Sequence, residues 1–281
     1  MLRQVPLTCF GQDELTEHFN EPSFTRNEEA FNQAVCFEAL RDHRRPRSAL
    51  RSAPLVDSYD GEAAVQAVRA QWRTRQLLKA AARLMERSGL HGVSMQAVAD
   101  EASVSVGLIY RYFSSKQDLL LAVILEVIHE FAARVPAAVT RAGDDPVERT
   151  AAGFRAYCEV IDQYRHAAVL TYRESRALSI ESREQIKELE VRTSDPLRSA
   201  IRDAVTAGIF YPVDVDLLTC DLLFLAHAWV LKHWHFEGSY DLDSYISAQI
   251  ALVLRASLDV RYQRKYCHLI GNPESLRESV L

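Results

Sequence analysis

The segment Gly107–Phe113 places two phenols and one guanidinium beside three apolar side chains. A helix that begins after Ser105 would turn the apolar set inward and leave the polar set wholly or partly exposed. The inward set is Leu108, Ile109 and Phe113, and the outward set is Val106, Gly107, Tyr110, Arg111 and Tyr112. Small residues let a helix approach closely, a guanidinium can pair bidentately with guanine or phosphate, and tyrosines suit backbone contacts. This chemistry suits the major groove of DNA.

A short helix and a turn precede this segment and would position it. Ser94 stands where an N-cap is needed, and apolar residues follow it with helical spacing at Met95, Val98, Ala99 and Ala102. The run Ser103–Ser105 breaks that spacing, and Ser105 is a second N-cap. Helix, turn and second helix in this order predict a helix-turn-helix motif.

A third helix begins near the run Ser114–Gln117. Ser114 and Gln117 have the spacing of a capping box, which leaves Lys116 beside free backbone amides at a positive helix terminus. A phosphate would bind there. We expect this helix to be long and to end at Pro136, because an apolar stripe runs through Leu119, Leu120, Val123, Ile124, Val127, Ile128 and Phe131.

The stretch from about Thr74 to Leu120 resembles the TetR family of one-component transcriptional regulators. Members typically have a helix ending near a Gly, a Thr/Ser-capped helix, an Ala-Gly-Val-Ser turn, a Gly-x-x-Tyr-x-[His/Tyr]-Phe helix and a Lys-[Glu/Asp]-x-Leu opening. The matching positions are Gly89, Ser94, 102–105, 107–113 and 116–119. The chain departs at Ser103, where the family usually has Gly, so a serine must take an uncommon positive φ.

The resemblance implies an all-α homodimer with an N-terminal three-helix DNA-binding domain and a larger helical domain for ligand binding and dimerisation. Its partners would be a double-stranded DNA operator and a small-molecule effector, and the Lys116 helix would transmit the ligand signal. The residues expected to contact DNA are Thr74, Ser94, Ser105, Val106, Gly107, Tyr110, Arg111, Tyr112 and Lys116. The alternative is a small helical subdomain whose tyrosines and arginine are only a solvated surface.

Composition agrees with a globular protein of one or two domains. The chain has 281 residues, of which 48% are hydrophobic and only 10 are Gly. No apolar run approaches the roughly 20 residues of a membrane span, and the N-terminus lacks a cationic start with an apolar region, so we expect a cytoplasmic protein. The 5 cysteines are far apart and form no CxxC pair, which predicts free thiols.

The net charge of −5 is unevenly distributed. Residues 65–118 hold eight Lys and Arg against four Asp and Glu, which leaves +4 there and −9 elsewhere. A basic module on an acidic body suits a DNA-binding protein, because only the docking face must be positive.

Residues 1–60 differ from the rest of the chain. Pro6, Pro22, Pro46 and Pro54 fall here, and helical periodicity is weak and confined to 27–40, so we expect a mostly disordered extension. Its arginines could form an arm in a minor groove, or only a solvated linker, or non-native sequence from an upstream translation start. They are Arg41, Arg44, Arg45, Arg47 and Arg51.

The remaining chain divides into a DNA-binding domain at 61–120, a body at 121–270 and a flexible tail at 271–281. Periodicity and capping signals predict helices and no strand. Besides the helices already described, we expect them over about 61–88, 145–164, 167–178, 182–207, 214–236 and 241–266, with Asp145 and Ser182 as caps and Gly89 as a stop.

The last two long helices have wide apolar surfaces with small residues that permit close approach. They favour a four-helix bundle between two subunits, whereas the alternative is that both are core of a monomer. The expected interface residues are Ala228, Trp229, Ala248, Ala251, Leu254 and Leu258.

Aromatic side chains with a few polar tips in the body predict a ligand cavity. The candidates are Tyr157, Tyr164, Thr171, Tyr172, Phe224, His227, Trp229 and His233. The segment 170–176 looks like one found in TetR-like proteins associated with lipid and acyl-CoA metabolism.

Catalysis lacks a candidate centre. Glu126 and His129 have the spacing of half a di-iron motif, but the long helices contain no second half. Around one helix, His233 and His235 would lie about 240° and 80° from His227, so the three rings cannot converge on a metal. We therefore expect neither enzyme, cofactor nor metal, but a repressor released from a palindromic operator by a small hydrophobic effector, such as a fatty acid or acyl-CoA. The alternatives are an activator, a ligand-independent DNA-binding protein and, from another class, an all-helical enzyme.

Overall fold

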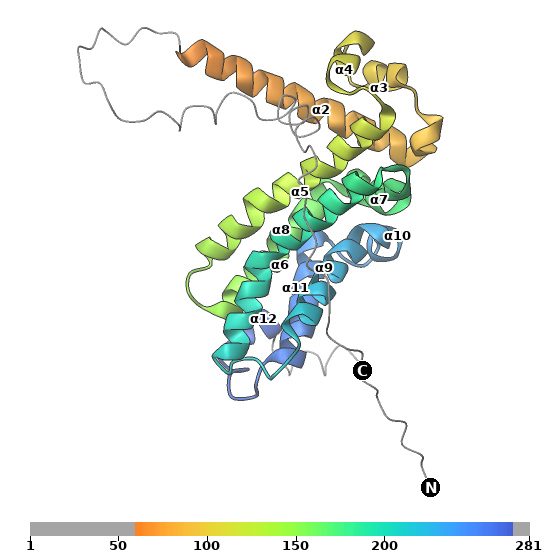
Figure 1. Cartoon of the computed structure of the whole chain (residues 1–281). Coiled ribbons are helices and arrows are strands. Elements are labelled where there is room, and N and C mark those ends of the chain that lie inside the picture. Colours follow the sequence, from red (N-terminus) through yellow and green to blue (C-terminus); the bar gives the residue numbers. More distant parts are fainter. Residues whose placement is uncertain (1–59, 272–281) are drawn as a thin grey trace, which may run out of the picture. The chain divides into compact units, whose positions relative to one another are not determined.

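The computed structural model describes residues 60–271, so the expected extension and tail lie outside the described residues except at Asp60 and Gly271. The described part is helical, as expected, and an isolated bridge between Phe210 and Leu258 is the extent of its β structure. The longer helices are α2 (Asp60–Gly92), α5 (Lys116–Arg141), α6 (Pro146–Gln163), α8 (Ile180–Thr206), α9 (Val215–Leu231) and α11 (Leu242–Ser257). The shorter ones are α3 (Met95–Glu101), α4 (Val106–Tyr112), α7 (Arg165–Glu174), η1 (Ser175–Ala177), α10 (His233–Phe236) and α12 (Cys267–Ile270) (Figure 1).

The helix-turn-helix forms where the sequence predicts it. The hydroxyl of Ser94 accepts a hydrogen bond from Ala97 N at 3.0 Å, and that of Ser105 accepts one from Leu108 N at 3.3 Å, so both serines are N-caps. Gly89 breaks the helical backbone of α2 with φ of 70°. Ser103 takes φ of 54° in the turn, as the departure from Gly requires.

Two expectations for α5 are wrong. Ser115, not Ser114, is its N-cap and accepts from Asp118 N at 3.0 Å, because the helix begins one residue later than a Ser114 cap requires. Pro136 lies inside the helix, which continues to Arg141. A proline removes one backbone donor, and burial of Val135 and Val139 on either side holds the helix together. The expected boundary between residues 120 and 121 thus falls within α5.

Three helix boundaries also differ from those expected. Ser179 caps α8, accepting from Ser182 N at 3.1 Å, so Ser182 itself is within the first turn. The helix expected over 214–236 is divided at Lys232, whose ψ of 27° and φ of −121° leave the helical region. The last long helix ends at Ser257, after which Tyr211 N bonds Ser257 O at 2.8 Å and the chain turns back.

The core of the body lies among α5, α6, α8 and α9, which pack against one another and run side by side in Figure 1. Gly153 on α6 permits a close crossing. A Cβ atom there would lie 3.1 Å from Val139 Cγ2 and 3.3 Å from Leu197 Cδ1, so a larger residue would force α5 or α8 away.

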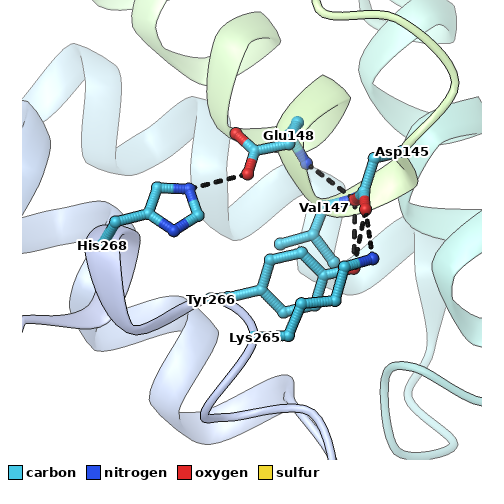
Figure 2. A network of polar contacts seen from close by, with 6 residues as sticks. All are labelled: Asp145, Val147, Glu148, Lys265, Tyr266 and His268. Carbon is cyan, nitrogen blue, oxygen red and sulfur yellow. Dashed lines mark hydrogen bonds and ion pairs between the residues drawn. The ribbon is translucent and has the colours of Figure 1, made fainter.

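A polar network, which we call the C-terminal latch, joins the segment after α11 to the start of α6 (Figure 2). Asp145 caps α6 by accepting from Val147 N at 3.0 Å, and it also accepts from Lys265 Nζ at 2.6 Å and from Tyr266 Oη at 3.0 Å. His268 Nε2 lies 2.8 Å from Glu148 Oε1. The latch therefore holds residues 265–268 against the start of α6.

Two remaining features of the sequence are seen in the described part. None of its helices combines the length and apolar character needed to cross a membrane. Its cysteines, Cys158, Cys220 and Cys267, are unpaired, while Cys9 and Cys36 lie outside the described residues.

Candidate nucleic-acid interface and effector cavity

Helix α4 presents the polar face that its sequence predicts. Ile109 is fully buried and anchors the helix, whereas Tyr110, Arg111 and Tyr112 are exposed. The guanidinium of Arg111 lies 5.4 Å from the ring centroid of Tyr112, which keeps the charge at the surface. Gly107 has no neighbour within 4 Å of an added Cβ, so this end of α4 is open to a close partner.

A hollow beside α4 brings together residues from three helix ends. Ser94, Tyr110 and Lys116, all predicted DNA contacts, line it. Lys116 begins α5, and its ammonium donates to His91 O at the end of α2 at 3.3 Å. A cation beside free amides at a helix N-terminus is a suitable place for a phosphate.

The other predicted DNA contacts differ in their exposure and in whether they line the hollow. Ser105 is exposed at the cap of α4, Val106 is half-buried, and Thr74 is half-buried on α2 and does not line the hollow. Sequence reasoning missed His91, which also lines the hollow. The signal that could have found it is the break at Gly89, since the residues that follow must turn toward α3.

A cavity of about 400 Å³ opens within the body. Its wall is mainly apolar and comes from α5 to α9, with representatives Ile124, Val127, Ile128, Phe131, Ile186 and Phe224. A few polar groups interrupt that wall: Thr171, Tyr172, Ser175, Arg183, Lys187, Glu190 and His227. We call this space the effector cavity, because an apolar wall with a few polar groups is typical of small-molecule sites.

Four of the predicted ligand residues line the effector cavity, namely Thr171, Tyr172, Phe224 and His227. Tyr157 is buried behind the wall and stacks on Phe131 with ring centroids 3.9 Å apart.

The other candidates lie elsewhere. Tyr164 lines a different, smaller cavity. Trp229 donates from Nε1 to Asp162 Oδ1 at 2.8 Å and packs 5.2 Å from the ring of His233. Tyr164, Trp229 and His233 thus lie outside the lining of the effector cavity.

Burial favours the neutral forms of two side chains in the effector cavity, His227 and Glu190. Desolvation lowers the pKa of His227 to about 4, so its ring is uncharged at neutral pH. Its centroid lies 6.0 Å from that of Tyr157 and 5.5 Å from that of Tyr172, both edge-on. Burial also raises the pKa of Glu190. Arg183 and Lys187 also line the cavity, so a mainly apolar wall is combined with cationic side chains.

Helix α7 contacts both the effector cavity and the DNA-binding domain. Its residues Ala168, Thr171 and Tyr172 line the cavity. From the same helix, the ring of His166 contacts the carboxylate of Glu86 on α2, and Arg173 Nη1 donates to Glu86 O at 2.8 Å. Helix α7 therefore connects the lining of the cavity to α2 through direct contacts.

The predicted dimer interface needs correction. Trp229, Leu254 and Leu258 are buried within the chain itself, so they have no surface left for a partner. Ala248 is exposed, and Ala228 and Ala251 are half-buried. The large apolar side chains that α9 and α11 do expose are Leu217, Phe224, Leu231 and Leu252.

The described residues contain no group of three or more His, Cys, Asp or Glu side chains that could hold a metal ion. What they do contain is a capped helix-turn-helix with a basic and aromatic face, joined to a helical body with a cavity. This arrangement defines a helix-turn-helix DNA-binding regulator.

Comparison with known proteins gives the family. The model of the bacterial regulatory proteins of the tetR family matches residues 77–123, and that of the tetracyclin repressor-like C-terminal domain matches residues 143–257. HbdR, an HTH-type transcriptional regulator of Aromatoleum sp. (strain CIB), is 34% identical over 204 residues, which are 73% of this chain and 89% of HbdR. The chain belongs to the TetR family of transcriptional regulators.

Two other proteins extend this likeness. The HTH-type transcriptional repressor KstR2 of Mycolicibacterium smegmatis is 27% identical over 171 residues, which are 59% of this chain and 80% of KstR2. The crystal structure of the TetR family regulator PfmR from Thermus thermophilus superposes with a TM-score of 0.56 at 25% identity, covering 64% of this chain and 97% of PfmR. These relatives are transcriptional regulators.

Proposed function

We propose that the chain is a homodimeric repressor that leaves a palindromic operator when an apolar effector of the fatty-acid or acyl-CoA type occupies the effector cavity. The observation that carries this proposal is the double role of α7. One side of α7 lines the cavity and the other contacts Glu86 on α2, so cavity and DNA-binding domain share one short helix. Repression is supported by the likeness to the repressor KstR2.

The DNA contacts that we assign start from the exposed face of α4. Arg111 reads a base or binds a phosphate, Tyr110 and Tyr112 contact the backbone, and Lys116 binds a phosphate at the start of α5. Ser94, Ser105, Val106 and Gly107 let the helix ends approach the duplex closely. Thr74 is the most remote of these assignments and rests on the family resemblance.

A dimer follows from the requirements of a palindromic site. Two α4 helices must lie about 34–36 Å apart to enter successive major grooves, which a single chain cannot provide. Leu217, Phe224 and Leu252 are 62%, 59% and 62% exposed on α9 and α11. Burying this apolar surface against a second copy would stabilise the pair, and large exposed apolar patches commonly mark such interfaces.

The wall of the cavity indicates the kind of effector. Isoleucines, a valine and phenylalanines suit an acyl chain, and the uncharged His227 can hydrogen-bond a carbonyl or hydroxyl without demanding a charged group. An effector that favours a different spacing of the two α4 helices lowers operator affinity. A hundredfold decrease requires about 2.7 kcal/mol of coupling, within the usual range for allostery.

Thermodynamic reciprocity provides the test. Fatty acids and acyl-CoAs of increasing chain length are titrated by calorimetry into the protein, alone and saturated with an operator selected from random DNA. Operator must weaken effector binding by the same factor by which effector weakens operator binding. A ligand that binds the cavity tightly but has the same affinity in both states would refute this mechanism for that ligand.

A further inference from the structure

A second cavity lies where α2, α5 and α7 meet, and its described lining shares no residue with that of the effector cavity. Its volume is about 110 Å³, and we call it the junction cavity. Leu78 and Ala82 of α2, Val123 of α5 and Ala167 of α7 form its apolar wall. An engineered apolar cavity of about 150 Å³ binds benzene, so this space suits about four to six non-hydrogen atoms.

Glu126 gives the junction cavity a buried hydrogen-bond acceptor. Its side chain is only 6% exposed and lines the cavity. Arg75 Nε forms an ion pair with Glu126 Oε1 at 2.9 Å, and this oxygen has no other partner within the described part of the chain. The same guanidinium also pairs with Glu130 Oε1 at 2.8 Å. A carboxylate oxygen can accept from more than one donor, so a ligand donor would add to the single contact with Arg75.

Lys79 supplies the complementary group. It lines the same cavity, and its ammonium lies 5.4 Å from the ring centroid of Tyr164. Three other polar residues of the lining are engaged elsewhere: Arg83 pairs with Glu101, Gln163 accepts from Arg134, and His166 contacts Glu86. We therefore expect a ligand to meet mainly the Glu126 carboxylate and the Lys79 ammonium. A cationic ligand would meet Lys79, an anionic ligand would meet Glu126, and a neutral polar head satisfies both residues.

We propose that the junction cavity is a second ligand site for a short neutral molecule whose polar head both donates and accepts hydrogen bonds, such as a primary carboxamide or alcohol. The head donates to Glu126 and accepts from Lys79, while the short carbon chain contacts Leu78, Ala82 and Val123. Because this occupant touches α2, α5 and α7 together, it stabilises the arrangement of these helices that the structure describes. The site is separate from the effector cavity and does not depend on the function proposed for it.

Three molecules of nearly equal size test the chemistry. Propionamide, propionate and n-propylammonium are titrated into the full chain, without DNA or effector, by ligand-observed saturation-transfer NMR. We expect propionamide to bind saturably and the two ions to bind at least about tenfold more weakly, since each meets a like charge. No saturable propionamide binding, or equal binding of propionate, would overturn the proposal.

Two alanines provide a matched pair of variants that locate the binding. Ala82 in the junction cavity and Ala168 in the effector cavity are each 4% exposed on a helix. Ala82→Leu should abolish propionamide binding by filling the cavity, whereas Ala168→Leu should retain it. Equal binding by both variants would contradict the assignment.

Glu126→Gln provides a second variant, which tests the proposal even if Ala82→Leu fails to fold. The substitution keeps the shape of the side chain and removes its charge, so propionamide should bind about tenfold more weakly. Unchanged affinity in a variant with the circular dichroism spectrum of the parent would contradict the role of Glu126. Because no operator is used, either failure leaves the proposed repressor function unaffected.

Discussion

The guanidinium of Arg173 on α7 donates a hydrogen bond of 2.8 Å to the backbone carbonyl of Glu86 on α2. Glu86 lies three residues before Gly89, where the helical backbone of α2 breaks. Since His166 contacts the carboxylate of the same residue, α7 holds Glu86 at two points. A movement of α7 therefore reaches the helix that supports α3 and α4.

Arg173→Ala tests this connection. The variant should fold and bind operator, but the effector should reduce its operator affinity roughly tenfold less than it does in the parent, a loss of about 1.4 kcal/mol of coupling. Fluorescence anisotropy with labelled operator, with and without effector, measures this factor.

Arg176→Ala is the matched control. Arg176 is exposed on η1, close to Arg173 in sequence, and its side chain makes no hydrogen bond or ion pair with another described residue. Its effector response should equal that of the parent. An unchanged response in Arg173→Ala as well would show that coupling takes another path.

Arg111 and Lys116 should differ in how they bind operator. Arg111→Ala should cost on the order of 1–3 kcal/mol and relax specificity if the guanidinium reads a base. Lys116→Ala should weaken all sequences similarly and flatten the salt dependence, because it removes a phosphate contact. Selected-site binding at several salt concentrations separates the two effects. If both variants bind a selected palindrome like the parent, α4 is not the DNA-reading helix.

Local signals explain why the helix-turn-helix could be predicted from the sequence. The caps at Ser94 and Ser105, the turn at Ser103 and the burial of Ile109 are each set by residues within a few positions of one another. Fold class follows from the same periodicities, repeated along the chain.

Features decided by tertiary contacts could not be predicted in this way. Burial of Val135 and Val139 carries α5 through Pro136, although a proline locally favours a stop. Tryptophan is a residue type that is common in interfaces, but Trp229 is buried and donates a hydrogen bond to Asp162 within the chain. The lining of the junction cavity comes from segments that are far apart in the sequence, so no single motif predicts it.

His227 predicts a specific dependence of stability on pH. Burial lowers its folded pKa from 6.5 to about 4, so the unfolded chain binds a proton that the folded chain does not between these values. The neutral ring therefore contributes fully to the free energy of unfolding above pH 6.5. This contribution, about 3 kcal/mol at most, is lost as the pH falls toward 4. In urea unfolding from pH 7 to 4, His227→Phe should therefore lose less stability than the parent. His235→Phe, at an exposed position, should show the same dependence of the free energy of unfolding on pH as the parent. The same dependence in all three proteins would contradict a buried neutral ring at His227.

Asp145 is the centre of the C-terminal latch and should be costly to remove. Burial alone would raise its pKa, but the hydrogen bonds from Lys265, Tyr266 and two backbone amides outweigh burial and lower it. Its contribution is therefore present above the ordinary pKa of 3.8 and is lost only as the pH falls through the lower folded value. At pH 7, Asp145→Ala should reduce the free energy of unfolding by about 2–3 kcal/mol and Tyr266→Phe by about 1 kcal/mol.

Chemical denaturation measures both losses. The neighbouring Asp144 is exposed and serves as the control, since Asp144→Ala should change the free energy of unfolding by less than about 0.5 kcal/mol. Equal costs at the two positions would mean that the latch does not stabilise the body.

Leu252 on α11 tests whether the exposed apolar surface of the body joins two subunits. Leu252→Asp places a carboxylate in the proposed interface, where an unpaired buried charge is strongly unfavourable, so the dimer should dissociate at least about a hundredfold more readily. Sedimentation velocity should then detect monomers at concentrations where the parent is dimeric, with a matching loss of operator affinity. Ile180 on α8 is 65% exposed against 62% for Leu252, so Ile180→Asp is a matched control that should remain dimeric. Dissociation by both variants, or by neither, would place the subunit contact elsewhere than on α9 and α11.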